Sequence, residues 1–90
     1  MNETIIRNIT REFRVSDLFL FGDSSTQRDI DILIVSNDFG KISRTKRKML
    51  IQKSSPKLDP ICLTDKEFQK LKKSNSSLWI KISTKGQKLL

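Results

Sequence analysis

Residues 29–35 restrict the possible folds of this chain more than any other segment. Asp29 and Asp31 stand two apart at its start, and from Ile32 to Val35 every side chain is aliphatic. Successive side chains of a strand point to opposite faces of the sheet, so an uninterrupted apolar run indicates that both faces are buried. We therefore predict a central strand whose polar start lies at the rim of the sheet.

Two further strands are expected beside this one. An apolar and aromatic run over residues 17–21, stopped by Gly22, predicts the first. Only six residues lie between Gly22 and Asp29, whereas a parallel crossover needs about a dozen, so this strand should be antiparallel to the central one. Another strand over 57–63 follows a predicted helix, which allows parallel pairing, and Pro60 restricts it to an edge or a bulge.

Helices should account for most of the remaining chain. They are expected over residues 2–13, 41–54, 64–73 and 75–85. The second should be basic and amphipathic, with an apolar side formed by Ile42, Met49 and Leu50 and with Lys46, Arg47, Lys48 and Lys53 elsewhere.

Two local signals set helix ends. Thr64 and Glu67 have the spacing of a capping box, and Gly86 should end the last helix.

The predicted class is α/β (α+β), a small mixed sheet backed by helices in the order α-β-β-α-β-α-α. The length favours one domain spanning residues 1–90.

Composition excludes several kinds of chemistry. The chain has 90 residues, no His and one Cys, so a His-based triad, a His zinc site and an internal disulfide are ruled out. Its longest apolar runs are too short to span a membrane. The first residues lack the basic start and apolar stretch of a signal peptide, so we expect a cytoplasmic protein that does not contact membranes.

Charge is divided unevenly along the chain. The net charge of +8 combines −3 over residues 1–40 with +11 over residues 41–90. Such a positive half favours polyanions, among them RNA and nucleoside triphosphates, or an acidic protein partner. It is equally compatible with a lysine-rich surface that only keeps a small protein in solution.

Three carboxylates are candidates for chemistry. Asp29 and Asp31 should leave the same face of the central strand, about 6.5–7 Å apart along the chain. Asp59 starts the neighbouring strand and can add a third carboxylate at the same rim. Carboxylate oxygens suit Mg²⁺, which keeps part of its coordination shell for substrate phosphates. Taken alone, each of these Asp residues is more simply interpreted as a solvent-exposed turn residue.

The segment after the first strand supplies polar groups for phosphates. Gly22 allows close approach of the backbone to a ligand, and Ser24 and Ser25 offer hydroxyls and N–H groups. Alone, this segment is an ordinary turn.

These residues together resemble a known family. Residues 20–25, Leu-Phe-Gly-Asp-Ser-Ser, are followed by residues 29–36, Asp-Ile-Asp-Ile-Leu-Ile-Val-Ser. This arrangement resembles the signature of the DNA polymerase β superfamily and, within it, is most similar to the minimal nucleotidyltransferases (MNT) of bacteria and archaea. Residues 36–39 and 58–68 resemble further segments of those proteins, so the resemblance covers residues 15–90.

The resemblance implies a polymerase β-like nucleotidyltransferase fold and a set of functional residues. Asp29, Asp31 and Asp59 would be the catalytic carboxylates and would bind two Mg²⁺ ions, with Mn²⁺ as an alternative metal. Gly22, Ser24, Ser25 and Arg28 would bind the triphosphate. A hydroxyl of a protein or RNA acceptor would attack the α-phosphate of ATP, receive AMP and release pyrophosphate.

The resemblance also implies a partner. Minimal members of the family often pair with a separate helical protein of the HEPN type, as the antitoxin of a toxin–antitoxin pair. We therefore expect such a partner, with RNA as a further candidate.

A second hypothesis follows from two departures from the family pattern. Asp23 stands where the family usually has Ser, and the loop up to Asp29 is shorter than usual. The chain would then be a catalytically degenerate module of the same fold that binds RNA or a partner protein. The short loop also lacks the basic element usual in the family. Arg28 would replace that missing positive charge, and so would the basic residues from Lys41 to Lys48 if their helix faces the site; otherwise these form a solvated helix face.

Overall fold

A four-stranded mixed sheet organises the molecule. The computed structural model describes residues 3–22 and 30–90. Its strand order is β3-β2-β1-β4, formed by β1 (Val15–Phe21), β2 (Ile30–Ser36), β3 (Leu58–Leu63) and β4 (Gln87–Lys88). β1 is antiparallel to β2, and β3 is parallel to it at the sheet edge. The predicted strand directions and the edge position of β3 are confirmed.

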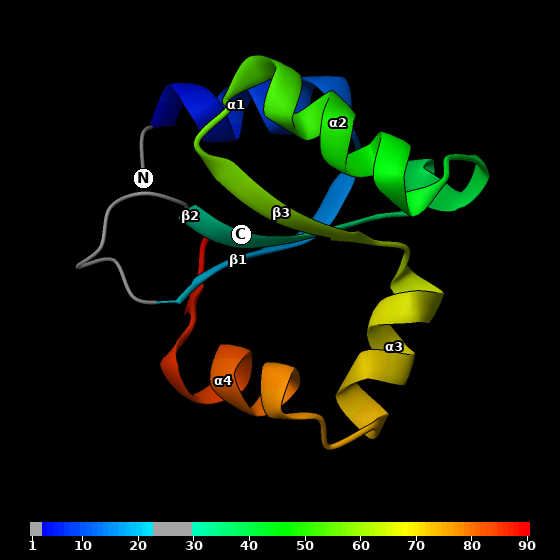
Figure 1. Cartoon of the computed structure of the whole chain (residues 1–90), viewed down its shortest axis with the longest axis vertical. Helices are drawn as coiled ribbons and strands as arrows, with labels where there is room; N and C mark the ends of the chain where they lie inside the picture. Colours follow the sequence, from blue (N-terminus) through cyan, green and yellow to red (C-terminus); the bar gives the residue numbers. More distant parts are fainter. Residues whose placement is uncertain (1–2, 23–29) are drawn as a thin grey trace.

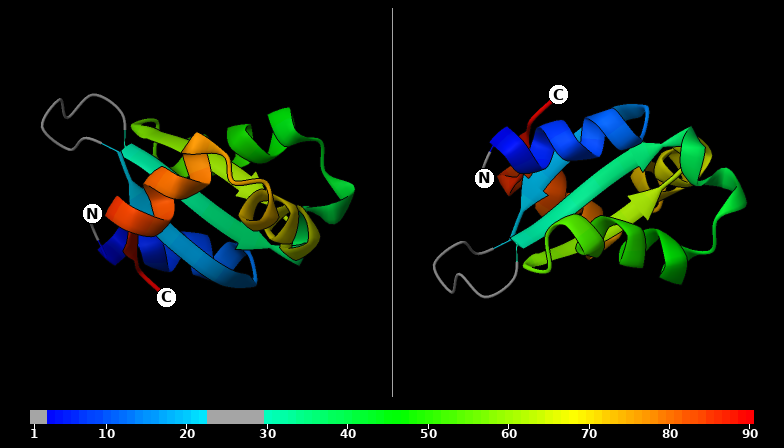
Figure 2. Two further views of the ribbon diagram at one scale, coloured as in Figure 1. Left: turned by 90° about the horizontal axis from the view of Figure 1, so that it is seen from below. Right: turned by 90° about the horizontal axis from the view of Figure 1, so that it is seen from above.

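Helices cover both faces of this sheet (Figure 1). They are α1 (Glu3–Glu12), α2 (Arg44–Ser54), α3 (Asp65–Lys73) and α4 (Ser77–Lys85). The first two lie on one face and the last two on the other, as the two views of Figure 2 show. Within the described part of the chain, none of these helices has the length and apolar character needed to cross a membrane.

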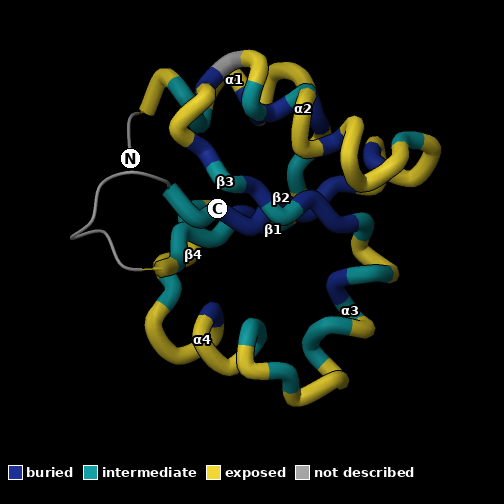
Figure 3. The backbone as a smooth tube through the Cα atoms, in the orientation of Figure 1, coloured by how far each residue is buried: buried dark blue, intermediate teal, exposed yellow. Residues whose placement is uncertain are grey.

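β2 is the most deeply buried element (Figure 3). All five residues from Ile32 to Ser36 have 0% exposure. Burial on both faces requires an apolar residue at every position of the run, which is what the sequence provides. The predicted central strand is therefore confirmed.

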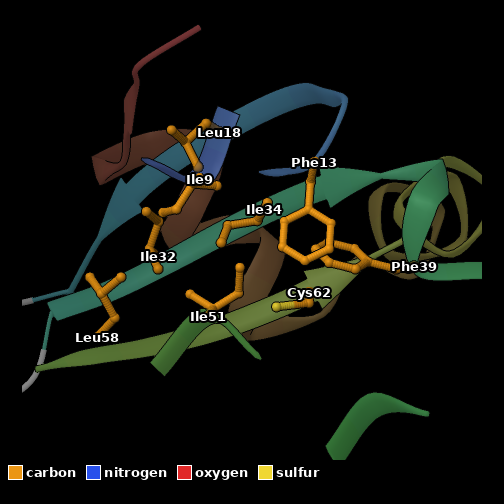
Figure 4. Close-up of a cluster of buried hydrophobic side chains, with 9 residues drawn as sticks. All are labelled: Ile9, Phe13, Leu18, Ile32, Ile34, Phe39, Ile51, Leu58 and Cys62. Carbon is orange, nitrogen blue, oxygen red and sulfur yellow. The ribbon is translucent and has the colours of Figure 1, made fainter. Parts of the chain in front are cut away.

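The residues of β2 divide between two apolar cores according to their parity. Ile32 and Ile34 pack beneath α1 and α2 with seven other buried residues, shown in Figure 4: Ile9, Phe13, Leu18, Phe39, Ile51, Leu58 and Cys62. Leu33 and Val35 face the other helix layer, where they pack with Leu63, Phe68 and Ile82. Asp31 has the parity of Leu33, and Asp59 has that of Leu63, so both project toward the α3–α4 side.

The basic helix differs from its prediction. Residues 37–41 form a short 3-10 helix, η1 (Asn37–Lys41), and α2 begins only at Arg44, where Ser43 accepts a hydrogen bond from the Lys46 N–H. Leu50 packs against the core as predicted, but Met49, predicted on the same apolar side, is 63% exposed, whereas Arg47 and Ile51 are buried. The helix is thus rotated by about one residue, roughly 100°, from the predicted orientation.

The C-terminal region also differs from expectation. α4 begins at Ser77 rather than Asn75, because Asn75 adopts a left-handed φ of 52° and Ser76 caps the helix. Beyond Gly86 the chain adds β4, which pairs with β1 and was not predicted. A two-residue strand carries too little hydrophobic pattern to be recognised in the sequence.

An ion pair between the buried Arg47 and the partly exposed Glu67 connects α2 to α3. The Arg47 guanidinium donates from Nη1 to Glu67 Oε1 at 2.7 Å and to the Cys62 carbonyl at 3.1 Å, and from Nε to the Ile42 carbonyl at 2.7 Å. Glu67 Oε1 also accepts the Thr64 N–H in the predicted capping box, which is confirmed. Burial alone would raise the pKa of the Glu67 carboxyl, but these hydrogen bonds and the Arg47 charge lower it to about 2.

Replacing Arg47 should therefore be costly. Arg47→Met leaves Glu67 without its buried partner and removes the donors to two carbonyls, so we expect a loss of about 3 kcal/mol of unfolding free energy. Arg44 pairs with the same carboxylate at 3.3 Å, but its side chain is 70% exposed, so Arg44→Met should cost less than about 1 kcal/mol. Urea unfolding of both variants tests this difference, and equal losses would contradict it.

Lowering the pH should remove part of the stability that the Glu67 carboxylate contributes. Because the folded pKa of Glu67 lies below its ordinary value of 4.5, its contribution is complete above about pH 4.5 and is lost as pH falls toward 2. Glu67→Gln should lower stability at pH 7 and flatten the stability curve over that interval. Arg47→Met should flatten the same interval only in part, because the Thr64 N–H still lowers the pKa of Glu67, and a parental slope in Glu67→Gln would show that Glu67 is not the titrating group.

Candidate active site

Two of the three predicted carboxylates meet at one end of the sheet. Asp31 near the start of β2 lies directly opposite Asp59 near the start of β3 in the parallel register. Neighbouring strands are about 4.8 Å apart, and register partners project to the same face. The fold therefore places these two acidic side chains next to each other.

Gly22 leaves space for one of these carboxylates. It follows β1 with φ +96°, a conformation that glycine adopts readily, and a Cβ built on it would collide with Asp31 Oδ2. The sequence predicted that this glycine allows the backbone to approach a ligand. The structure shows that it allows close approach of the Asp31 side chain.

Asp59 forms an ion pair with the basic helix. Lys48 Nζ lies 3.0 Å from Asp59 Oδ1, and both side chains are 48% exposed. Because α2 covers the opposite face of the sheet, Lys48 reaches Asp59 around the outer edge of β3. Among residues 41–48, Lys48 therefore brings its charge to a predicted site carboxylate, whereas Arg47 is buried against Glu67. Replacement of the charge missing from the short loop stays a prediction.

A hollow of about 280 Å³ adjoins this ion pair along the outer edge of β3. It is lined by Arg44, Thr45 and Lys48 from α2 and by residues 60–63 from β3. Burial raises the pKa of the Cys62 thiol to about 12, although Arg47 and Lys48 oppose the shift. The thiol therefore stays protonated and does not serve as a nucleophile.

The residues at this end of the sheet fit a hard divalent cation. Two adjacent carboxylates repel each other, and a cation between them relieves that repulsion while receiving the oxygen ligands that Mg²⁺ prefers. No three Asp, Glu or Cys side chains among residues 3–22 and 30–90 gather into a metal site. A cation held by Asp31 and Asp59 would thus take its remaining ligands from elsewhere, including water and substrate phosphates.

The other predicted site residues fall outside the described part of the chain. They are Asp29, Ser24, Ser25 and Arg28, together with Asp23. Their roles in metal and triphosphate binding stay predictions from the sequence.

Two solved structures have a similar architecture. One is a protein from Sulfolobus solfataricus that has been proposed to be a nucleotidyltransferase. The match covers 76% of this chain and 68% of the Sulfolobus chain, with a TM-score of 0.59 and 21% identity. The other is the MNT antitoxin from Shewanella oneidensis, solved in complex with a tri-AMPylated HEPN toxin. The match covers all of this chain and 72% of the antitoxin chain, with a TM-score of 0.60 and 20% identity. No protein-family model and no curated protein sequence matches the chain.

This similarity and the strand order decide the fold. The chain has the polymerase β-like nucleotidyltransferase fold. The fold predicted from residues 20–36 and 58–68 is thereby confirmed. In this nucleotidyltransferase fold, Asp31 and Asp59 occupy neighbouring strands, as the predicted parallel pairing implied.

One contact at the site was beyond the reach of sequence reasoning. Lys48 was grouped with the other basic residues of its helix, and nothing in its spacing distinguishes it from Lys46. Its partnership with Asp59 depends on the rotation of α2, which is fixed by the burial of Arg47 and Ile51.

Gly22 should tolerate no side chain. Gly22→Ala places a Cβ against the Asp31 carboxylate at an unfavourable φ, so we expect a loss of about 2–3 kcal/mol of unfolding free energy. Gly40 is the matched control, because a Cβ there has nothing within 4 Å, and Gly40→Ala should change stability by less than about 0.5 kcal/mol.

A double variant separates the two causes at Gly22. In an Asp31→Ala background the collision is gone and only the backbone cost is left, so Gly22→Ala should be less destabilising there. Denaturant unfolding of the four proteins measures this coupling, and purely additive losses would show that Asp31 does not crowd Gly22.

Proposed function

We propose that this chain is a metal-dependent nucleotidyltransferase module that transfers AMP from ATP to a hydroxyl of a macromolecular acceptor. The observation that carries the proposal is the register pairing of Asp31 with Asp59 at one end of a nucleotidyltransferase fold. The glycine beside Asp31 is a second support, because it leaves that carboxylate room to lie close to the backbone.

The proposed roles follow from position and chemistry. Asp31 and Asp59, with Asp29, would hold divalent Mg²⁺ or Mn²⁺, whose chemistry when bound is to polarise the α-phosphate and to lower the pKa of the attacking hydroxyl. Gly22, Ser24, Ser25 and Arg28 would bind the triphosphate. Asp59 is half exposed and able to accept the proton of the acceptor hydroxyl as the new P–O bond forms and pyrophosphate leaves.

The proposed acceptor and partner rest on two observations. The similar antitoxin was solved with a HEPN toxin that carries AMP groups, and residues 41–90 of this chain carry a net charge of +11. We propose a HEPN-type helical protein as partner and acceptor, in a toxin–antitoxin pair. RNA is the alternative acceptor that the same positive charge favours.

Removing the charge of one carboxylate should weaken nucleotide binding without lowering the stability of the fold. Asp31→Asn keeps the side-chain volume but removes the charge, so we expect at least tenfold weaker binding of ATP with Mg²⁺ and unchanged or slightly higher stability in metal-free buffer. Asp65→Asn makes the same change on α3, beyond the opposite end of β3, and should leave binding unchanged. Calorimetric titration and thermal unfolding provide the two readouts.

Activity has its own test. Incubation with ATP labelled at the α-phosphate, Mg²⁺ and a HEPN-type protein should label the acceptor, and ATP labelled at the γ-phosphate should not. If neither the parent nor Asp23→Ser binds any nucleoside triphosphate with Mg²⁺ or Mn²⁺ at millimolar concentration, the enzyme proposal is wrong. The degenerate module that binds RNA or a partner protein then becomes the better description.

A further inference from the structure

The Asp59 carboxylate already has a cation from the protein itself. Lys48 Nζ is 3.0 Å from it, and Asp59 stands beside Asp31 in the sheet register. A positive side chain at this position reduces the repulsion between the two neighbouring carboxylates. The same ammonium group would repel any divalent cation that enters between them.

The position of Lys48 is fixed by its helix, while its head group is exposed. Arg47, the preceding residue, is buried and anchors α2 to Glu67 and to the Cys62 carbonyl. The Lys48 side chain is half exposed at the edge of β3 and also lines the 280 Å³ hollow beside Arg44 and Thr45. Because its head group is half exposed, Lys48 can leave Asp59 for solvent without any movement of α2.

We infer that Lys48 is a built-in counter-ion of Asp59 that a divalent cation must displace. The inference rests on the proposed metal site and adds a control on it. In the absence of nucleotide, Lys48 weakens cation binding at the pair formed by Asp31 and Asp59. A nucleoside triphosphate favours the exchange, because its phosphates supply further oxygen ligands to the cation and negative charge toward the displaced lysine. Lys48 is thus a positioning residue that makes metal binding depend on the nucleotide.

Cation binding without nucleotide tests this directly. Lys48→Met keeps an unbranched stem and removes the charge, so we expect Mn²⁺ to bind about five- to tenfold more tightly, as calorimetric titration would measure. The difference between parent and variant should shrink when a non-hydrolysable ATP analogue is present. Lys46→Met is the matched control: Lys46 lies on the same helix, is exposed, and makes no ion pair within the described residues. Its Mn²⁺ affinity should equal that of the parent.

A double variant shows whether the gain passes through the predicted carboxylate. In an Asp59→Asn background, Lys48→Met should no longer raise the Mn²⁺ affinity above that of Asp59→Asn alone, and far-ultraviolet circular dichroism would establish that each variant is folded. An increase that persists without the Asp59 charge would overturn the inference, because Lys48 would then act through the general field of the protein.

The outcomes distinguish this inference from the proposed function. Unchanged or weaker Mn²⁺ binding by Lys48→Met, in a protein whose parent binds Mn²⁺, overturns the role of Lys48 and leaves the metal site standing. Binding that is detectable only after Lys48→Met supports both. If parent and Lys48→Met both fail to bind Mn²⁺ with and without the ATP analogue, the metal site is wrong and the counter-ion role falls with it.

Discussion

The buried guanidinium of Arg47 determines how the two helix layers fit around the sheet. Its side chain is only 6% exposed, and a charge in that environment is tolerated only when it is fully paired. Glu67 supplies the opposite charge from the other side of the sheet edge, and the Ile42 and Cys62 carbonyls accept the remaining bonds. Any displacement of α2 relative to α3 would break this set, so one residue fixes the orientation of the helix that also carries Lys48.

The same helix closes the exposed edge of β3. In a parallel ladder alternate residues direct their main-chain groups to the same side, and residues 58, 60 and 62 direct theirs away from β2. Gln52 donates to the Leu58 carbonyl at 3.0 Å, and Arg47 donates to that of Cys62. Pro60 has no N–H to offer. The strand edge is thus a poor template for a further strand, and the start of β3, with Asp59, stays accessible to a ligand.

Features decided by local pattern could be predicted, and features decided by packing could not. The uninterrupted run from Ile32 to Val35 indicated a strand buried on both faces, and the loop length after Gly22 indicated antiparallel pairing. Because parallel pairing and parity then fix neighbours, the proximity of Asp31 to Asp59 also followed from the sequence. The burial of Arg47 did not, since an arginine is rarely buried and its partner Glu67 is distant in sequence. The error in the rotation of α2 concealed the contact of Lys48.

The two ends of the sheet differ in how well their residues satisfy local structural preferences. At the end where β2 and β3 finish, Ser36 caps η1, Thr64 and Glu67 complete a capping box, and Asn37 accepts the Asp65 N–H at 3.0 Å. At the opposite end the chain needs a left-handed glycine, and it places two carboxylates in register. Sequences generally satisfy local preferences where only stability is at stake and depart from them where a site is built. Lys48 pairs with Asp59 while both side chains stay half exposed, and an exposed ion pair of this kind adds little to stability, which agrees with the cation-binding role proposed for this end of the sheet.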